Sequence, residues 1–286
     1  MDDTATILGA LIQTLPSVRD QHRTTTNLFQ LLKLVARKEA EALFSGSTVN
    51  PMEFDPFGEL TFPYHKMGAI DSLNLFDLNE LIIFSFYEAN RGRYRRALDI
   101  GANIGLHSII LRKCGFEVRS YEPDPDHFDI LKRNLELNQC VDVEANKAAV
   151  SDKVGSLEFI RVLGNTTASH LTGSRDPYGE LESFPVEVES IRPLIEWADL
   201  IKMDVEGHEP TILLATSRSD WQNTDALVEI QNEENAGSVF DHFNALGVNL
   251  FSQKINWNQV TSVEDMPTSY RDGTLFITSK SNMPWG

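Results

Sequence analysis

The stretch ALDIGANIG, residues 97–105, decides the fold of this chain. It begins as an apolar strand, turns at two glycines and runs into residues 106–113, which have the pattern of a helix. Because glycine carries no Cβ, Gly101 and Gly105 let the backbone turn sharply and approach a ligand closely. The following helix would offer free N–H groups at its start. The stretch therefore predicts the nucleotide-binding corner of an α/β fold.

An acidic residue at the end of the next strand supports this prediction. Residues 116–121 have the pattern of a strand that leads directly into Glu122. Glu122 lies roughly 20 residues after Gly101, where a dinucleotide-type site keeps the carboxylate that accepts hydrogen bonds from ribose hydroxyls. We therefore expect Glu122 to bind the ribose of an adenosine cofactor.

The glycine-punctuated loop also indicates which cofactor to expect. A dinucleotide-binding G-x-G-x-x-G frame starting at Gly101 needs two further small residues, but the chain has Asn103 and Leu106 there. The missing second glycine is the one that makes room for a pyrophosphate. Asp99 at the end of the strand instead suits a ligand with an ammonium and no phosphate, and S-adenosyl-L-methionine is such a ligand. The alternative is a turn that binds nothing.

Three motifs together resemble those of one family. The runs DIGANIG at 99–105, YEP at 121–123 and IKMDVEGHE at 201–209 are similar to those of the FkbM family of S-adenosylmethionine-dependent methyltransferases. The similarity covers about residues 57–280, and K-M-D-x-E-G-x-E is its most specific part. The resemblance implies a doubly wound, seven-stranded Rossmann-like sheet and methyl transfer, usually to a hydroxyl of a sugar, glycan or natural product.

The expected cofactor site lies at the carboxyl ends of the strands, where open α/β sheets bind their ligands. Asp99 and the 101–105 loop would surround the methionine part, and Glu122 the ribose. The methyltransferase arrangement further implies that the loop after the third strand, including Val150, lies beside the adenine. The expected cofactor-binding residues are Asp99, Gly101, Asn103, Gly105, Glu122, Ala149, Ser151 and Asp204.

Transfer to a hydroxyl also requires a group that removes the hydroxyl proton, which calls for a carboxylate or an imidazole. Asp204 and Glu206 are expected to face the methyl group or the acceptor, and His208 lies between acids. His170 lies in residues 163–185, a long stretch that we expect to form a substrate loop or lid. The candidate catalytic residues are therefore Asp204, Glu206, His208 and His170.

Other charged residues near these candidates are expected to be structural. Lys202 would pair with the acids, and Glu209 would complement the positive end of the helix that Pro210 opens. Carboxylates at 204, 206 and 209 could suit Mg²⁺ or Ca²⁺. Because the sequence lacks a clear further ligand set, we expect no metal.

The 286 residues are expected to form two parts, an N-terminal helical cap at 1–56 and the methyltransferase domain at 57–286. Apolar positions recur at helical spacing in residues 4–15 and 27–44. The later strands are expected at 143–150, 157–160, 186–188, 199–203, 226–230, 248–252 and 274–278.

The amino-acid composition limits which binding partners and which cellular compartment we expect for this chain. Acids outnumber bases 42 to 25, and a net charge of −17 repels phosphodiester backbones, so no nucleic acid is expected. Cys114 and Cys140 lack the pattern of a disulfide framework, which fits a reducing cytoplasm. No apolar run approaches the roughly 18 residues that span a bilayer, so no membrane insertion is expected. The expected partners are a small-molecule or glycan acceptor and a second copy of the chain through the N-terminal helices.

Two other functions remain open. An NAD(P)-dependent oxidoreductase could use a related sheet, but Asn103, Leu106 and the absence of a Tyr-x-x-x-Lys pair weigh against it. A non-catalytic cofactor-binding protein could use the same fold, because a fold does not fix a function.

Overall fold

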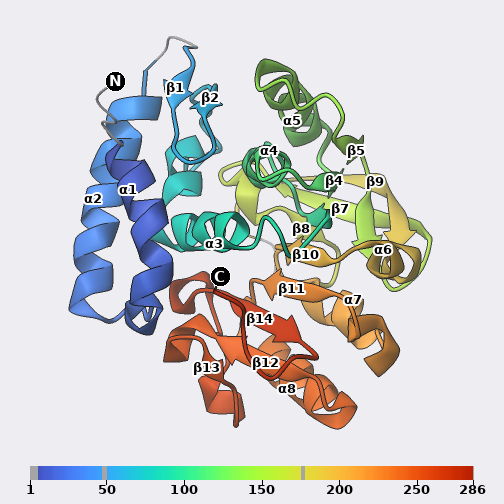
Figure 1. Ribbon diagram of the computed structural model, residues 1–286. Coiled ribbons are helices and arrows are strands. Elements are labelled where there is room, and N and C mark those ends of the chain that lie inside the picture. Colours follow the sequence, from blue (N-terminus) through green and yellow to red (C-terminus); the bar gives the residue numbers. More distant parts are fainter. Residues whose placement is uncertain (1–5, 47–49, 175–177, 286) are drawn as a thin grey trace.

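The computed structural model describes residues 6–46, 50–174 and 178–285 (Figure 1). A central sheet has the strand order β13-β12-β14-β11-β10-β3-β4-β5, and its five strands from β11 to β5 are parallel. The parallel strands are β3 (Arg96–Ile100), β4 (Glu117–Tyr121), β5 (Glu144–Asn146), β10 (Leu200–Met203) and β11 (Asp225–Val228). The antiparallel strands are β12 (Asn249–Ser252), β13 (Asn258–Gln259) and β14 (Leu275–Thr278).

Helices cover both faces of this sheet because successive strand residues alternate between two cores. Ala97 of β3 belongs to one core, whereas Leu98 and Ile100 belong to the other. The first face carries α3 (Leu78–Ala89), α4 (Leu106–Lys113) and α5 (Pro125–Leu137). The second carries α6 (Ile191–Trp197), α7 (Glu209–Leu214) and α8 (Glu233–Leu246). The predicted doubly wound α/β fold is confirmed, with the two-residue β13 as an eighth strand.

Polar residues and glycine set the ends of these helices. The side chain of Asp77 accepts from the amide of Asn79 at the start of α3, at 2.8 Å. Asp124 caps α5 in the same way. Gly247 ends α8 with a φ of +63°, a left-handed cap that glycine adopts without a Cβ clash.

The N-terminal helices extend the core on the α3 side. Helices α1 (Ile7–Thr14) and α2 (Asn27–Phe44) pack on each other and on α3 (Figure 1). Phe44 stacks on Phe76 with ring centroids 4.4 Å apart. Residues 4–5 of the expected first helix lie outside the described residues. The remaining segments here are η1 (Leu15–Gln21), β1 (Met52–Glu53), β2 (Glu59–Leu60) and η2 (Ser72–Phe76).

A second sheet, with the order β6-β9-β7-β8, is inserted between β5 and α6. Its strands are β6 (Ala149–Ser151), β7 (Gly155–Val162), β8 (His170–Leu171) and β9 (Leu181–Ser190). The expected strand at 143–150 is therefore two strands that belong to different sheets. The expected loop at 163–185 contains η3 (Thr166–Ala168), β8 and the start of β9, while residues 175–177 lie outside the described residues. Most of the first half of β9 is exposed, so hydrophobic alternation does not reveal it.

No helix among the described residues is both long and apolar enough to cross a membrane.

A buried carboxylate at the start of β11 generates a stability prediction. Asp225 is 1% exposed and accepts hydrogen bonds from Tyr94 Oη (2.7 Å), Thr278 Oγ1 (2.5 Å) and Lys280 Nζ (2.6 Å). Asp225→Ala would leave these donors without their acceptor and should lower the free energy of unfolding by about 3–5 kcal/mol. Urea denaturation measures this loss. Asp241→Ala, at an exposed position of α8, is the control, and equal midpoints for the two variants would contradict the prediction.

Candidate active site

A cavity of about 430 Å³ lies at the carboxyl ends of the parallel strands. Each of four neighbouring strands places a residue that follows it in the wall, and these residues are Gly101, Glu122, Asp204 and Glu229. Residues of η2, α3 and the inserted sheet line much of the remaining cavity. The cavity thus occupies the position where ligands bind in open α/β sheets.

The first glycine of the ALDIGANIG stretch admits no side chain. Gly101 has a φ of +77°, and a Cβ there would lie 1.7 Å from the carbonyl oxygen of Asp204. Gly105, in contrast, begins α4 with a φ of +91° and packs against Leu131, away from the cavity wall. Asn103 lines the cavity, and its Oδ1 has no partner among the described residues. Two of the three loop residues expected at the cofactor therefore line the cavity.

Glu122 is held between two backbone amides. Its Oε2 accepts from the amide of Asn103 at 2.8 Å, and its Oε1 accepts from the amide of Asp124 at 2.9 Å. Burial raises the pKa of Glu122 to about 8, although the two amides act in the opposite direction. These bonds fix the carboxylate in the wall and tie the loop after β3 to the end of β4.

The inserted sheet is clamped to this side of the cavity. Arg161 of β7 donates to both carboxylate oxygens of Asp124, through Nε at 2.8 Å and Nη2 at 2.6 Å. This pair lowers the pKa of Asp124 although burial opposes the effect. The His127 ring of α5 also bonds to Thr166 Oγ1 at 2.9 Å. The clamp positions Asp124, whose amide in turn holds Glu122.

A buried ammonium lies at the other side of the cavity. Lys202 Nζ lies 3.3 Å from the Gly101 carbonyl oxygen, 3.8 Å from Asp99 Oδ1 and 3.9 Å from Asp204 Oδ2. Burial would lower the pKa of Lys202, but the surrounding carboxylates raise it above its usual value, so the ammonium stays charged. Asp99 does not line the cavity; it lies behind the wall and accepts from Ser108 Oγ at 2.6 Å.

A neutral histidine of α4 bonds to two residues of α3, of which Glu80 lines the cavity. His107 Nε2 lies 2.8 Å from Glu80 Oε2, and the Tyr87 hydroxyl lies 3.0 Å from His107 Nδ1. Burial and the Lys202 charge lower the pKa of His107 to about 3. With Glu80 ionised, the carboxylate can only accept, and His107 then donates to Glu80 and accepts from Tyr87. Sequence reasoning missed these residues, since no motif links α3 to the strand ends.

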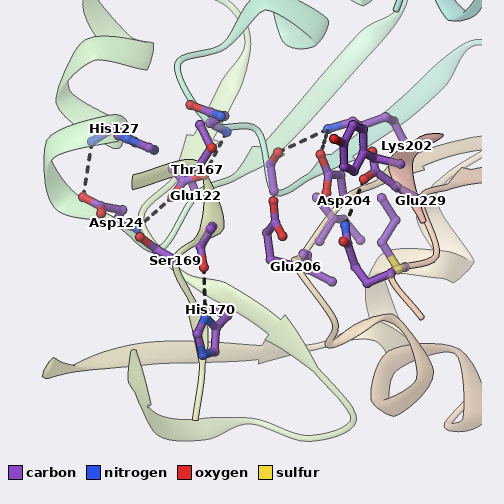
Figure 2. A pocket seen from close by; sticks show the side chains of 18 of the residues that line it. Glu122, Asp124, His127, Thr167, Ser169, His170, Lys202, Asp204, Glu206 and Glu229 are labelled. Atoms are coloured by element: carbon purple, nitrogen blue, oxygen red, sulfur yellow. Dashed lines mark hydrogen bonds and ion pairs between the residues drawn. The ribbon is translucent and has the colours of Figure 1, made fainter. Parts of the chain in front are cut away.

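Carboxylates gather opposite Glu122 (Figure 2). Asp204, Glu206 and Glu229 line the cavity together, and Gln231 Nε2 donates to Glu229 Oε1 at 2.9 Å. Burial and the neighbouring carboxylates raise the pKa of Glu229 well above its usual value, and burial also raises the pKa of Asp204. Sequence reasoning missed Glu229 because the expected strand at 226–230 enclosed it. Since β11 ends at Val228, Glu229 lies at the carboxyl edge.

The structure keeps His208 out of the cavity wall. Its Nε2 bonds to Ser151 Oγ at 2.8 Å and its Nδ1 to Ser174 Oγ at 2.9 Å. Ser151 is likewise outside the wall, whereas Ala149 lines it. His208 thus joins the loop after β10 to the inserted sheet instead of facing the cavity.

Glu209 also stabilises the loop after β10. Its Oε1 accepts from the amides of Val205 (3.1 Å) and Gly207 (3.2 Å), and burial raises its pKa to about 7. The structural role expected for Glu209 agrees with these contacts. Within the described residues, no group of three or more His, Cys, Asp or Glu side chains is arranged to hold a metal ion.

His170 lines the cavity but lies apart from the other catalytic candidates. It is 1% exposed on β8, and Figure 2 shows it away from Asp204 and Glu206. The structure therefore brings Asp204 and Glu206 together and separates His170 and His208 from them.

Comparisons with known proteins identify relatives of this chain. It is 27% identical over 159 residues to "Methyltransferase sdnD" of Sordaria araneosa, which covers 44% of this chain and 61% of that protein. It is 26% identical over 154 residues to "Methyltransferase 1" of Beauveria bassiana (strain ARSEF 2860), which covers 46% and 62%. The chain thus spans about six tenths of the length of these curated relatives.

The chain is also similar to solved structures, at lower sequence identity than to these relatives. A crystal structure of the O-methyltransferase from Bacillus cereus in complex with SAH superposes with a TM-score of 0.36 at 13% identity, covering 68% of this chain and 79% of that one.

The family described as "Methyltransferase FkbM domain" matches residues 99–252, which is more than half of the chain. This match spans the loop after β3, Glu122 and the loop after β10. It confirms the predicted family and, with it, a methyltransferase domain that uses S-adenosylmethionine. The chain belongs to the FkbM methyltransferase family.

Proposed function

We propose that this chain transfers the methyl group of S-adenosylmethionine to a hydroxyl of a sugar, glycan or natural product. One observation carries the proposal: a single cavity holds the amide-anchored carboxylate of Glu122 on one side and the carboxylates of Asp204 and Glu206 on the other. The first suits a ribose, and the others suit an ammonium and an acceptor hydroxyl.

The residues around the cavity fit the proposed methyl donor. Gly101 lets the loop after β3 pass close to the Asp204 backbone, and the buried oxygens Asn103 Oδ1 and Asp204 Oδ1 have no partner among the described residues. Such acceptors suit the ammonium of the methionine part. Ala149 and Val150 give an apolar wall suited to the adenine. Asp99 would act from behind, through Lys202.

Methyl transfer to a hydroxyl requires the protein to align the methyl group with the acceptor hydroxyl, exclude water and accept one proton. When bound, S-adenosylmethionine supplies an electrophilic methyl group on a positively charged sulfur. We assign the acceptor proton to Asp204 or Glu206, because both line the cavity, whereas His208 is bonded at both ring nitrogens. Burial raises the pKa of Asp204, which makes its ionised form a stronger base.

The charges of the cavity disfavour the alternative of a nicotinamide dinucleotide. Lys202 is the sole lysine or arginine among the described residues that line it. Because Lys202 already pairs with Asp99 and Asp204, it leaves little positive charge to compensate the phosphates of a pyrophosphate. This argument agrees with the substituted second glycine of the loop.

We also propose a cytoplasmic location and a small-molecule or glycan acceptor. Cys114 and Cys140 are free and buried, as in proteins of reducing compartments. The size of the cavity suits a cofactor together with a modest acceptor. Association through the N-terminal helices is proposed because Leu31 and Leu34 of α2 are 58% and 65% exposed.

Calorimetric titration tests the proposed cofactor. S-adenosylhomocysteine should bind with a micromolar Kd, and NAD or NADP should not bind. Glu122→Ala should weaken the binding at least about tenfold, because a hydrogen bond to a charged group contributes about 1.5–3 kcal/mol. Glu136→Ala, at an exposed position of α5, is the matched control. Binding of NAD or NADP alone would overturn the proposal.

The pKa of Glu122 makes cofactor binding pH-dependent. Because burial raises this pKa to about 8, the free protein holds Glu122 mostly protonated below that pH. Binding that uses the ionised carboxylate must then release a proton, so affinity for S-adenosylhomocysteine should rise up to about tenfold per unit between about pH 6 and 8. Calorimetry across this range measures the slope. Glu122→Gln should bind more weakly and lose this slope, and a flat profile in the unaltered protein would contradict the prediction.

Replacing the proposed base tests the chemistry. Asp204→Asn should lower turnover about 100-fold or more on an acceptor found by screening hydroxylated compounds, because the amide cannot take the proton. The amide keeps an Oδ1 acceptor, so affinity for S-adenosylhomocysteine should change much less. The rate of S-adenosylhomocysteine release measures turnover, with the exposed Asp241→Asn as control. Unchanged turnover would remove Asp204 from the mechanism.

A further inference from the structure

Two carboxyl groups leave the central sheet side by side in this cavity. Met203 and Val228 pair in register at the ends of β10 and β11. Asp204 and Glu229 follow them, and the amide of Glu229 donates to the Met203 carbonyl oxygen at 3.0 Å, which continues the ladder. Figure 2 shows the two acidic side chains together, beside Lys202. Because adjacent strands lie about 4.8 Å apart, one small ligand can contact both carboxyl groups.

The hydrogen bonds of Glu229 leave one of its two oxygens available. Gln231 Nε2 donates to Oε1 at 2.9 Å, and Oε2 has no hydrogen-bond partner among the described residues. A buried oxygen without a partner, such as Asp204 Oδ1, is cut off from solvent, but Glu229 Oε2 is not. Because Glu229 is half-buried and lines the cavity, Oε2 opens into the cavity.

The surroundings of Glu229 favour a neutral carboxyl group. Burial and then the charges of Asp204 and Glu206 raise the pKa of Glu229 well above its usual value. Lys202 is the sole lysine or arginine among the described residues of the wall, and it forms its ion pair with Asp204, at 3.9 Å, and not with Glu229. Because Oε1 accepts from Gln231, the proton of the neutral carboxyl lies on Oε2. Glu229 therefore presents a hydrogen-bond donor to the cavity.

We propose that Glu229 determines acceptor specificity: its Oε2 donates a hydrogen bond to a second oxygen of the acceptor, next to the hydroxyl that receives the methyl group. This inference rests on the proposed function, in which Asp204 or Glu206 takes the hydroxyl proton. The attacking oxygen bonds to the methyl carbon while the bond from that carbon to sulfur breaks. Glu229 keeps its own proton throughout and is not the base.

The arrangement defines a class of acceptor. Asp204 and Glu229 are neighbours on adjacent strands, so the two acceptor oxygens that they contact lie on neighbouring atoms of the acceptor. A vicinal diol, as in a sugar ring, fits this requirement. An isolated alcohol would leave the Glu229 donor without a partner, and a site built to bond a second oxygen discriminates against a compound that lacks it.

Matched acceptors test the class of substrate. The probes are cis-1,2-cyclohexanediol, trans-1,2-cyclohexanediol, methyl α-D-glucopyranoside, methyl α-D-mannopyranoside and cyclohexanol, each with saturating S-adenosylmethionine. The rate of S-adenosylhomocysteine release gives kcat/KM. The best diol should exceed cyclohexanol at least about tenfold per hydroxyl. Equal values, or no methylation of any diol, would overturn the inference.

Two substitutions separate a donor from a base or a structural residue. Glu229→Leu has no donor and should lower kcat/KM on the best diol at least about tenfold. Glu229→Gln keeps an oxygen for Gln231 and an amide donor at the ε2 position, so it should lose less than about threefold. Glu136→Leu, at an exposed position of α5, is the matched control. Equally large losses in both Glu229 variants would overturn the donor role.

Infrared spectroscopy tests the donor without an acceptor. The difference spectrum between the unaltered protein and Glu229→Gln at pH 7 should contain the C=O stretching band of a protonated carboxyl. Bands of an ionised carboxylate in its place would overturn the inference. Both Glu229 variants should bind S-adenosylhomocysteine within about threefold of the unaltered protein. Failure of the unaltered protein to bind S-adenosylhomocysteine would instead overturn the proposed function itself.

Discussion

The ammonium of Lys202 is the charge on which the arrangement of this cavity depends. Lys202 of β10 pairs in register with Asp99 of β3, so their side chains leave the same face of the sheet. Its Nζ lies within 4 Å of Asp99, Asp204 and the Gly101 carbonyl. Without this charge, buried carboxylates at two neighbouring strand ends would repel each other. The lysine therefore allows an acidic site to be built at the point where the strands end.

The inserted sheet forms a wall of the cavity, and its attachments include one beside Glu122 and one at the loop after β10. Arg161 holds Asp124 beside the proposed ribose site, and Ser151 and Ser174 hold His208 in the loop after β10. These contacts connect the sheet to residues that follow two different strands of the central sheet. The wall is thus fixed relative to both the proposed cofactor side and the proposed acceptor side.

The sequence was sufficient to predict the elements whose residues have a local signature. Short stretches of sequence contain the glycines at 101 and 105, the spacing to Glu122 and the apolar runs of β3 and β10. The fold follows from these features. The role of His208 could not be predicted, because its partners are set by tertiary packing. His208 meets Ser151, which lies 57 residues away in the chain. Glu229 was missed because one strand boundary was placed two residues too late.

The strand order has a consequence for how the protein is made. β14 lies between β11 and β12, although it follows both in the chain and lies beyond residue 252, where the family match ends. As the chain leaves the ribosome, β11 and β12 each keep an unpaired edge until residues 275–278 emerge. The nascent protein therefore exposes aggregation-prone strand edges until β14 is made, and a fragment that stops at residue 252 would lack the strand that joins them.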